Sequence, residues 1–320
     1  MRRALVTGAT GFVGSHLVEE LTRKDYEVTC LVRRSSDLKW LEPLKVSTCV
    51  GDCRDPRSLE EAVKGKDFVF HLAGLTKARR DSDLLEANAR GTENVVGAVA
   101  RHNPGLRRFV HVSSLAAVGP CVNGRPATEE TEPRPVSVYG RSKLEAEAAV
   151  IGLGDRVPVT VVRPPAVYGP RDRDFLVFFR MVRRGVVPYW GRCSYSLIYV
   201  DDLVRGIVEA AESPAAAGEV FFLSEGEYTN DAIADVIAEA VGRKPIRLRV
   251  PRGAVSVLAG IGQRLGGPGI FNRDKARELA HDRWACDPSK AGVKLGFRAK
   301  IRLNEGIKWT ANWYRIHQWL

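Results

Sequence analysis

Short apolar runs alternate with longer amphipathic stretches over the first 165 residues of the chain. The runs are rich in β-branched residues and apolar at successive positions, which is typical of strands covered on both faces. They lie at residues 4–7, 27–32, 46–50, 68–71, 109–113 and 159–163. Stretches with helical periodicity separate most of them, at residues 13–23, 57–63, 84–101 and 138–151. Because strand–helix alternation produces right-handed crossovers, the pattern predicts an α/β fold with a doubly wound parallel sheet.

The pattern changes after Arg163. Pro164 and Pro165 begin a segment rich in Pro, Gly and Arg, for which we expect irregular structure to about residue 194. Strands are expected again at residues 197–200 and 220–223, and helices dominate from residue 229 onward. The chain is therefore expected to form a sheet lobe from residues 1–165 and 196–224, and a smaller, discontinuous, mainly helical lobe from residues 166–195 and 225–320.

The composition is that of an ordinary globular protein, with 44% hydrophobic and 27% charged residues. The longest apolar runs are far shorter than the ~18 residues that cross a bilayer, and the first residues contain no apolar signal region. The six cysteines form no CxxC pair, which favours reduced thiols. We therefore expect a cytoplasmic protein. No metal site is expected, because Asp201 and Asp202 have no partnering histidines and are better explained as caps of the helix that begins there.

The net charge of +11 is concentrated in the last quarter of the chain. Residues 243–320 contain 17 basic and 5 acidic residues, whereas residues 1–242 contain 32 and 33. A solvated basic surface is the simplest explanation, and an anionic ligand or an anionic membrane surface is the alternative. Peripheral membrane contact would also use the apolar helical pattern at Ala254, Val257, Leu258, Ile261 and Leu265. Nucleic acid is not expected, since no recognised binding motif accompanies the charge.

A glycine-rich turn follows the first predicted strand and opens the first predicted helix. It reads Gly8-Ala9-Thr10-Gly11-Phe12-Val13-Gly14. Glycines at these positions let the backbone turn tightly and approach a pyrophosphate, which then lies among the free N–H groups of the helix N-terminus. The context of strand, turn and helix predicts a Rossmann-type dinucleotide site, with Gly8, Thr10, Gly11, Phe12 and Val13 in contact with the cofactor.

Tyr139 and Lys143 form a YxxxK pair on one face of a predicted helix. A free tyrosine titrates near ~10 and is a poor base at neutral pH, but a nearby fixed cation favours the phenolate. Ser114 directly follows a predicted strand and stands 25 positions before Tyr139. The three residues are the predicted catalytic group.

The glycine spacing, together with Ser114, Tyr139 and Lys143, resembles the extended short-chain dehydrogenases/reductases of the NAD-dependent epimerase/dehydratase superfamily, over nearly the whole chain. The resemblance implies that Ser114 hydrogen-bonds the reacting oxygen and that Tyr139 is the general acid–base. It also implies that Lys143 holds both the tyrosine and the nicotinamide ribose. It also implies further cofactor contacts from Asp52, Cys53, Leu72, Ala73, Gly74, Asn88, Pro165 and Val167. A homodimer formed through the helices at 84–101 and 138–151 is expected from the same resemblance.

One position bears on the choice of cofactor. Arg33 stands 19 positions after Gly14, where NAD enzymes place an acid on the ribose hydroxyl, and Arg34 follows it. A guanidinium binds a 2′-phosphate, whereas a carboxylate repels it. NADP(H) is therefore the expected cofactor, with NAD(H) as the alternative if both arginines face solvent.

Two departures from the sugar-nucleotide enzymes bear on the substrate. No arginine stands at 196 or 197, where those enzymes often grip a phosphate, and Leu115-Ala116 replaces the Asp-Glu of the dehydratases. The pattern more closely resembles 3β-hydroxysteroid dehydrogenases and dihydroflavonol-reductase-like enzymes. We expect an NADP(H)-dependent oxidoreductase acting on a secondary alcohol, ketone or aldehyde of a fairly apolar small molecule. The alternatives are a nucleotide-sugar epimerase with tightly bound NAD and a non-catalytic NADP sensor, which would be expected to lack Tyr139 or Lys143.

Overall fold

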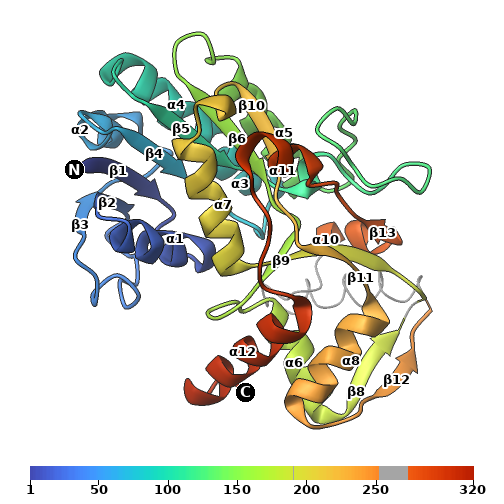
Figure 1. Ribbon diagram of the computed structural model, residues 1–320. Helices are drawn as coiled ribbons and strands as arrows, with labels where there is room; N and C mark the ends of the chain where they lie inside the picture. Colours follow the sequence, from blue (N-terminus) through green and yellow to red (C-terminus); the bar gives the residue numbers. More distant parts are fainter. Residues whose placement is uncertain (190, 252–272) are drawn as a thin grey trace.

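The computed structural model describes residues 1–189, 191–251 and 273–320. In this part of the chain, seven parallel strands form one sheet in the order β10-β6-β5-β4-β1-β2-β3 (Figure 1). Their bounds are β1 (Arg2–Thr7), β2 (Tyr26–Val32), β3 (Ser47–Val50), β4 (Phe68–His71), β5 (Arg108–Val112), β6 (Val159–Arg163) and β10 (Glu219–Phe222). The predicted doubly wound parallel sheet is confirmed.

Helices cover both faces of this sheet because its strands are apolar on both faces. Ala4 and Val6 of β1 belong to the core beneath α1 (Phe12–Arg23) and α7 (Val200–Glu212). Leu5 points the opposite way, into a second core beneath α2 (Glu60–Val63), α4 (Gly91–His102) and α5 (Val138–Ile151). Short helical segments complete this region: η1 (Pro56–Leu59), α3 (Asp81–Leu84), the π-helical η2 (Leu85–Arg90), η3 (Leu115–Ala117) and η4 (Pro214–Ala216).

The segments expected to form the smaller lobe contain strands as well as helices. Their larger sheet consists of β7 (Ala166–Tyr168), β9 (Ser194–Tyr199), β11 (Gly226–Thr229) and β13 (Arg283–Trp284), and a second sheet pairs β8 (Val186–Tyr189) with β12 (Ile246–Arg249). The strand expected at 197–200 thus pairs outside the main sheet, while α7 and β10 return to it. The helices are α6 (Phe175–Arg184), α8 (Asn230–Val241), α10 (Arg273–Leu279), α11 (Ser289–Leu295) and α12 (Leu303–Ile316). In Figure 1, α12 lies beside α6 and α8.

The segment expected to be irregular after Arg163 is instead partly regular. It contains β7, α6 and β8. Helix α6 buries Leu176, Phe179 and Val182, a spacing of three residues that places them on one face. It ends at Gly185, whose φ of 86° is left-handed and free of strain only for glycine. The prolines and arginines around α6 obscured this amphipathic period in the sequence.

Asp202 does not cap α7 with its side chain as expected. The α7 N-cap is Tyr199, and the buried Asp202 carboxylate accepts hydrogen bonds from the backbone N–H groups of Lys300 and Ile301, both at 2.8 Å. Arg205 on the same helix forms an ion pair with it. Asp202 therefore holds the segment that precedes α12 against the main sheet.

The sequence also raised expectations about membrane-spanning helices, metal sites, cysteines and a C-terminal apolar pattern. Among the described residues, no helix is long and apolar enough to cross a membrane. No group of three His, Cys, Asp or Glu side chains in the same part of the chain is arranged to hold a metal ion. The six cysteines are free thiols. The apolar pattern at 254, 257, 258, 261 and 265 lies outside the described residues.

Candidate active site

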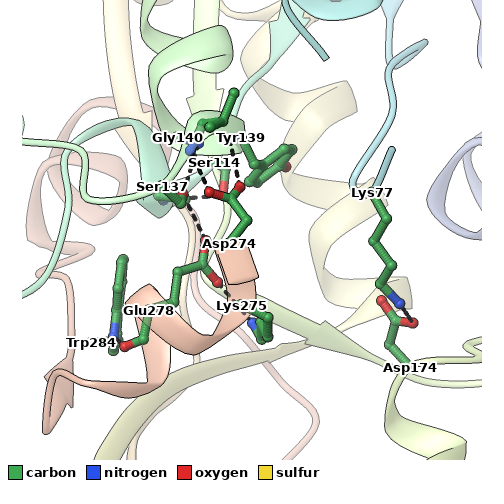
Figure 2. Close-up of polar contacts among 12 residues, drawn as sticks. Lys77, Ser114, Ser137, Tyr139, Gly140, Asp174, Asp274, Lys275, Glu278 and Trp284 are labelled. Carbon is green, nitrogen blue, oxygen red and sulfur yellow. Dashed lines mark hydrogen bonds and ion pairs between the residues drawn. The ribbon is translucent and has the colours of Figure 1, made fainter. Parts of the chain in front are cut away.

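The three predicted catalytic residues come from adjacent elements at the carboxyl edge of the main sheet. Ser114 follows β5, and Tyr139 and Lys143 occupy the first two turns of α5. The carboxyl edge of a parallel sheet is where α/β enzymes place their ligands. Figure 2 shows Ser114 and Tyr139 together, with α10 of the smaller lobe beside them.

Ser114 and Tyr139 are joined by a side-chain hydrogen bond. The Ser114 oxygen also accepts from the backbone N–H of Ala116 at 3.1 Å, which fixes the side chain after the strand ends. Gly140 allows this approach, because a Cβ there would overlap the carbonyl oxygen of Ala116. The start of α5 thus packs closely against η3, which brings the Tyr139 phenol within hydrogen-bond distance of Ser114.

Burial raises the pKa of Tyr139 to about 12, and the Glu278 carboxylate acts in the same direction, while the hydrogen bond from Ser114 opposes it. The sequence led us to expect Lys143 to lower this pKa. That expectation is wrong for the arrangement in the structure, because desolvation outweighs other influences on the phenol. Tyr139 is therefore a neutral phenol at pH 7, suited to donating a proton.

Lys143 is 5% exposed, and its ammonium donates a 2.7 Å hydrogen bond to the carbonyl oxygen of Val112. Burial lowers its pKa to about 8, an effect that the nearby Glu147 opposes. Glu147 in turn accepts three hydrogen bonds from Arg163 in a buried ion pair. The lysine is thus held beneath the site by a backbone carbonyl.

Two buried histidines lie behind Lys143. His71 and His111 stack with their centroids 5.5 Å apart, and Lys143 lowers the pKa of both after the larger effect of burial. His71 bonds the hydroxyls of Thr7 at 2.7 Å and Thr92 at 2.9 Å. His71 is therefore a satisfied core residue, as the sequence predicted.

The glycine turn has the shape that a pyrophosphate requires. Gly8 has φ of 72°, and a Cβ there would lie 2.7 Å from the backbone nitrogen of Ala73. A Cβ at Gly14 would overlap the carbonyl of Gly8. Gly11 is the N-cap residue of α1, and no side chain among the described residues caps this helix start. The first turn of α1 contains no acidic residue. Its first N–H groups are consequently open to an anion, and these features fit a dinucleotide.

The loop after β4 runs beside this turn. Ala73 donates to the Thr7 hydroxyl at 3.2 Å. Asn88 in η2 is 1% exposed and exchanges two hydrogen bonds with the backbone of Leu75, and it also donates to Ser142 of α5 at 2.9 Å. Gly74 keeps the loop close, because a Cβ there would lie 2.8 Å from the Asn88 amide oxygen. Asn88 thus ties the predicted cofactor loop to the catalytic helix from behind.

The predicted adenine end of the groove lies at the carboxyl ends of β2 and β3. Arg33 and Arg34 follow β2 and are both exposed. Asp52 accepts hydrogen bonds from the Arg54 guanidinium at 3.1 and 2.7 Å, which lowers the pKa of its carboxyl group. Cys53 beside it is a partly buried thiol whose pKa burial raises to about 12. This end therefore presents positive charge and a compensated carboxylate.

A cavity of about 160 Å³ opens on Ser114 and Tyr139. Much of its wall is apolar, with contributions from Leu115, Ala116, Pro165, Leu279 and Trp284. Tyr195, Ser196, Lys275 and Glu278 supply the polar part. Pro165 is buried in this wall, whereas Val167 lies partly exposed in β7. The residues from α10, β9 and β13 were not predicted, because only the tertiary fold brings them to the site.

The sheet topology and the glycine turn define an NAD(P)-dependent enzyme of the extended short-chain dehydrogenase/reductase superfamily. The chain belongs to the NAD dependent epimerase/dehydratase family, whose model matches residues 4–223. The resemblance drawn from the sequence is therefore confirmed.

Similar proteins differ in the reaction that their names give. The chain is 32% identical to a ceramide reductase of Caulobacter vibrioides over 98% of its own length and 95% of that protein. It is 30% identical to a UDP-glucose 4-epimerase of Vibrio cholerae, over 96% and 94%. A solved structure of MoeE5 in complex with UDP-glucose and NAD superposes with a TM-score of 0.80 and 27% identity, covering 99% of both chains. The names of these similar proteins therefore differ in both the reaction and the substrate class.

Proposed function

We propose that this protein is an NADP(H)-dependent oxidoreductase that interconverts a ketone or aldehyde and the corresponding alcohol on a fairly apolar small molecule. The observation that carries the proposal is the cavity in which Ser114 and Tyr139 meet a largely apolar wall. An apolar wall with a few convergent polar groups suits a substrate whose reacting oxygen is its main polar feature in the site. The similarity to a ceramide reductase supports the same substrate class.

The side chains supply proton transfer and orientation. The nicotinamide, when bound, supplies or accepts hydride. In the reducing direction, Tyr139 donates its phenolic proton to the substrate oxygen, and Ser114 holds that oxygen by a hydrogen bond. Lys143, one helical turn after Tyr139, would hold the nicotinamide ribose. The alcohol is oxidised by the same steps in reverse.

The preference for NADP(H) is also a proposal, based on exposed arginines at the end of β2. Arg33→Asp should weaken NADPH binding by about 1.5–3 kcal/mol, the strength of a hydrogen bond to a charged group, and move the preference toward NADH. Arg57→Asp, an equal charge change at an exposed position of η1, is the control. Fluorescence titrations with both cofactors provide the measurement. Unchanged affinities in the Arg33 variant would show that Arg33 faces solvent in the complex.

The reaction class is tested by incubating purified protein with NADPH and a panel of apolar ketones, aldehydes and UDP-sugars. Net loss of NADPH absorbance with a ketone or aldehyde is expected. Interconversion of a UDP-sugar with no net change in cofactor would instead identify a nucleotide-sugar epimerase with tightly bound NAD, the alternative left open by the sequence.

A further inference from the structure

Helix α10 of the smaller lobe contacts the N-terminus of the catalytic helix through two carboxylates (Figure 2). Asp274 accepts hydrogen bonds from the backbone N–H groups of Val138 at 2.6 Å and Tyr139 at 2.9 Å. Glu278, one turn further along α10, accepts from the hydroxyl of Ser137 at 2.9 Å. Ser137 is the N-cap of α5 and itself accepts from the N–H of Gly140 at 3.0 Å.

These contacts satisfy the backbone donors that a helix start leaves without intrahelical partners. Negative charge is favourable at that end of the helix dipole. Because the bonded N–H groups include that of Tyr139 itself, Asp274 fixes the backbone from which the phenol projects. Ser137 supplies the usual N-cap of α5, and Asp274, which is distant in the sequence, adds acceptors for the N–H groups of Val138 and Tyr139.

Glu278 also lies in the wall of the substrate cavity, together with Lys275. The Lys275 ammonium donates to Glu278 at 2.9 Å, and the indole N–H of Trp284 donates to the backbone carbonyl of Glu278 at 3.1 Å. The Glu278 side chain therefore lines the cavity, bonds the N-cap of α5 and acts on the phenol. This arrangement connects the substrate lobe with the proton donor.

We propose that Asp274 and Glu278 are positioning residues for Tyr139. Asp274 sets the backbone of the catalytic tyrosine, and Glu278 places a negative charge beside the phenol, which keeps the phenol protonated and able to donate to a carbonyl oxygen. This inference rests on the proposed function, since it assigns Tyr139 the role of proton donor.

The electrostatic surroundings of Tyr139 agree with this assignment. Among the described residues, the charged groups around it include Lys275 and Glu278 in the cavity wall and Asp274 at its backbone N–H, and Lys143 stands one turn further along its own helix. His71 and His111, of β4 and β5, lie behind Lys143 and are uncharged at neutral pH because burial lowers the pKa of both. Glu278 is the carboxylate that raises the pKa of Tyr139, after the larger effect of burial.

The decisive variant is Glu278→Gln, which keeps the shape and removes the charge. Oxidation of the alcohol that corresponds to the ketone found in the panel requires a deprotonated phenol, so the rise of kcat/KM with pH should move to lower pH by about 1 unit. Glu278→Asp, which keeps the charge, should preserve the wild-type profile. Glu239→Gln, an exposed change on α8, is the charge-matched control. Superimposed profiles for wild type and Glu278→Gln would overturn the electrostatic role.

A second readout does not depend on turnover. Ultraviolet titration of tyrosinate in the presence of NADP⁺, as the difference between each protein and its Tyr139→Phe counterpart, should show a lower midpoint in Glu278→Gln. If no carbonyl compound is reduced but a sugar is epimerised, the proposed function fails, while this titration still tests the inference. An unchanged midpoint would reject the role of Glu278 whatever the substrate.

The backbone role is tested by Asp274→Ala. The variant should lower kcat about tenfold, because a small displacement of a catalytic group is costly, while NADPH affinity stays within about twofold of wild type. Thr229→Ala removes the N-cap of α8, whose hydroxyl accepts from Ala232, and serves as the matched control for lost capping. If Asp274→Ala and Thr229→Ala had equal kcat values and similar losses of melting temperature, Asp274 would be a structural cap without a positioning role.

Discussion

Tyr139 shows how its surroundings define the role of a side chain. Its sequence context places a cation one helical turn away, yet burial raises the pKa of the phenol to about 12, with a carboxylate acting in the same direction. The Lys143 ammonium donates a 2.7 Å hydrogen bond to the backbone carbonyl of Val112. The neutral phenol and its hydrogen bond to Ser114 together favour proton donation to a developing alkoxide.

Tyr139→Phe removes the hydroxyl and little else. We expect kcat for carbonyl reduction to fall by about 10²–10⁴, the usual contribution of a general acid, with NADPH affinity close to wild type. Lys143→Ala should impair both turnover and cofactor binding, because the lysine is expected to hold the ribose as well. Steady-state kinetics and cofactor titration distinguish the two patterns. Substantial turnover in the phenylalanine variant would remove Tyr139 from the mechanism.

The buried histidines predict a loss of stability in acid. Burial lowers the pKa of His71 to about 3 and that of His111 well below its usual value, so the unfolded chain binds protons near pH 6.5 that the folded chain does not. Stability therefore falls as pH drops below about 6.5, by up to about 1.4 kcal/mol per pH unit for each histidine. His111→Phe should flatten this slope in urea unfolding at pH 6.5–4.5.

Among the described residues, neither ring nitrogen of His111 has a hydrogen-bond partner, so its replacement by an apolar ring leaves no donor stranded. His281→Phe, at an exposed position, is the control for the loss of an imidazole. An identical slope in the His111 variant and wild type would place the acid sensitivity elsewhere.

At the scale of elements, α5 is fixed at three points along its length. Asp274 and Glu278 hold its N-terminus, Asn88 bonds Ser142 in its middle, and the Glu147 carboxylate pairs with Arg163 of β6. Each contact comes from a different part of the sequence. Tyr139 and Lys143 thus lie on a helix whose position is determined by contacts from several distant parts of the chain.

Breaking the Glu147–Arg163 pair should be costly because it is fully buried, with side-chain exposures of 2% and 6%. Glu147→Leu leaves an uncompensated guanidinium in the core, and we expect it to lower the free energy of unfolding by about 3–5 kcal/mol. Adding Arg163→Met should restore most of the loss. Chemical denaturation of both single variants and the double variant measures the coupling, and additive losses would show that the pair does not act as a unit.

At the scale of the whole molecule, the sequence predicted the main sheet well because its signals are local. The strands Phe68–His71 and Val159–Arg163 and the helix Val138–Ile151 match the predicted bounds, since apolar runs and the helical period define them directly. Helix α6 was missed among prolines and arginines. The contacts of Asp274 and Glu278 with α5 could not be predicted, because no local pattern indicates which distant helix a carboxylate will cap.

The same distinction between local signals and distant contacts applies to the catalytic residues and to the oligomeric state. The side chains of Ser114 and Tyr139 lie together because α5 packs against η3. The family resemblance predicted that these two residues act together. The cavity wall from α10 and β13 depends on how the chain returns from the smaller lobe. The homodimer expected through the helices at 84–101 and 138–151 stays a prediction, which light scattering at micromolar concentration tests.

Contact with an anionic membrane also stays a prediction. The described residues include one exposed apolar surface that could make this contact. On β12, Ile246 and Leu248 are 73% and 57% exposed, and Val186, which pairs with Ile246, is 43% exposed. Arg243 and Lys244 are exposed just before this strand. Apolar side chains beside basic ones are what a protein needs to rest on an anionic surface, with charge for attraction and apolar area for retention.

We therefore expect the protein to co-sediment with vesicles containing phosphatidylserine at low salt, and less with neutral phosphatidylcholine vesicles. Binding should weaken as salt rises, because exposed charges are screened. Ile246→Ser with Leu248→Ser should reduce the bound fraction severalfold, whereas Val293→Ser, at an 86% exposed position on α11, should not. Absence of binding to the anionic vesicles at low salt would reject membrane contact, and the basic last quarter would then serve an anionic ligand or simply face solvent.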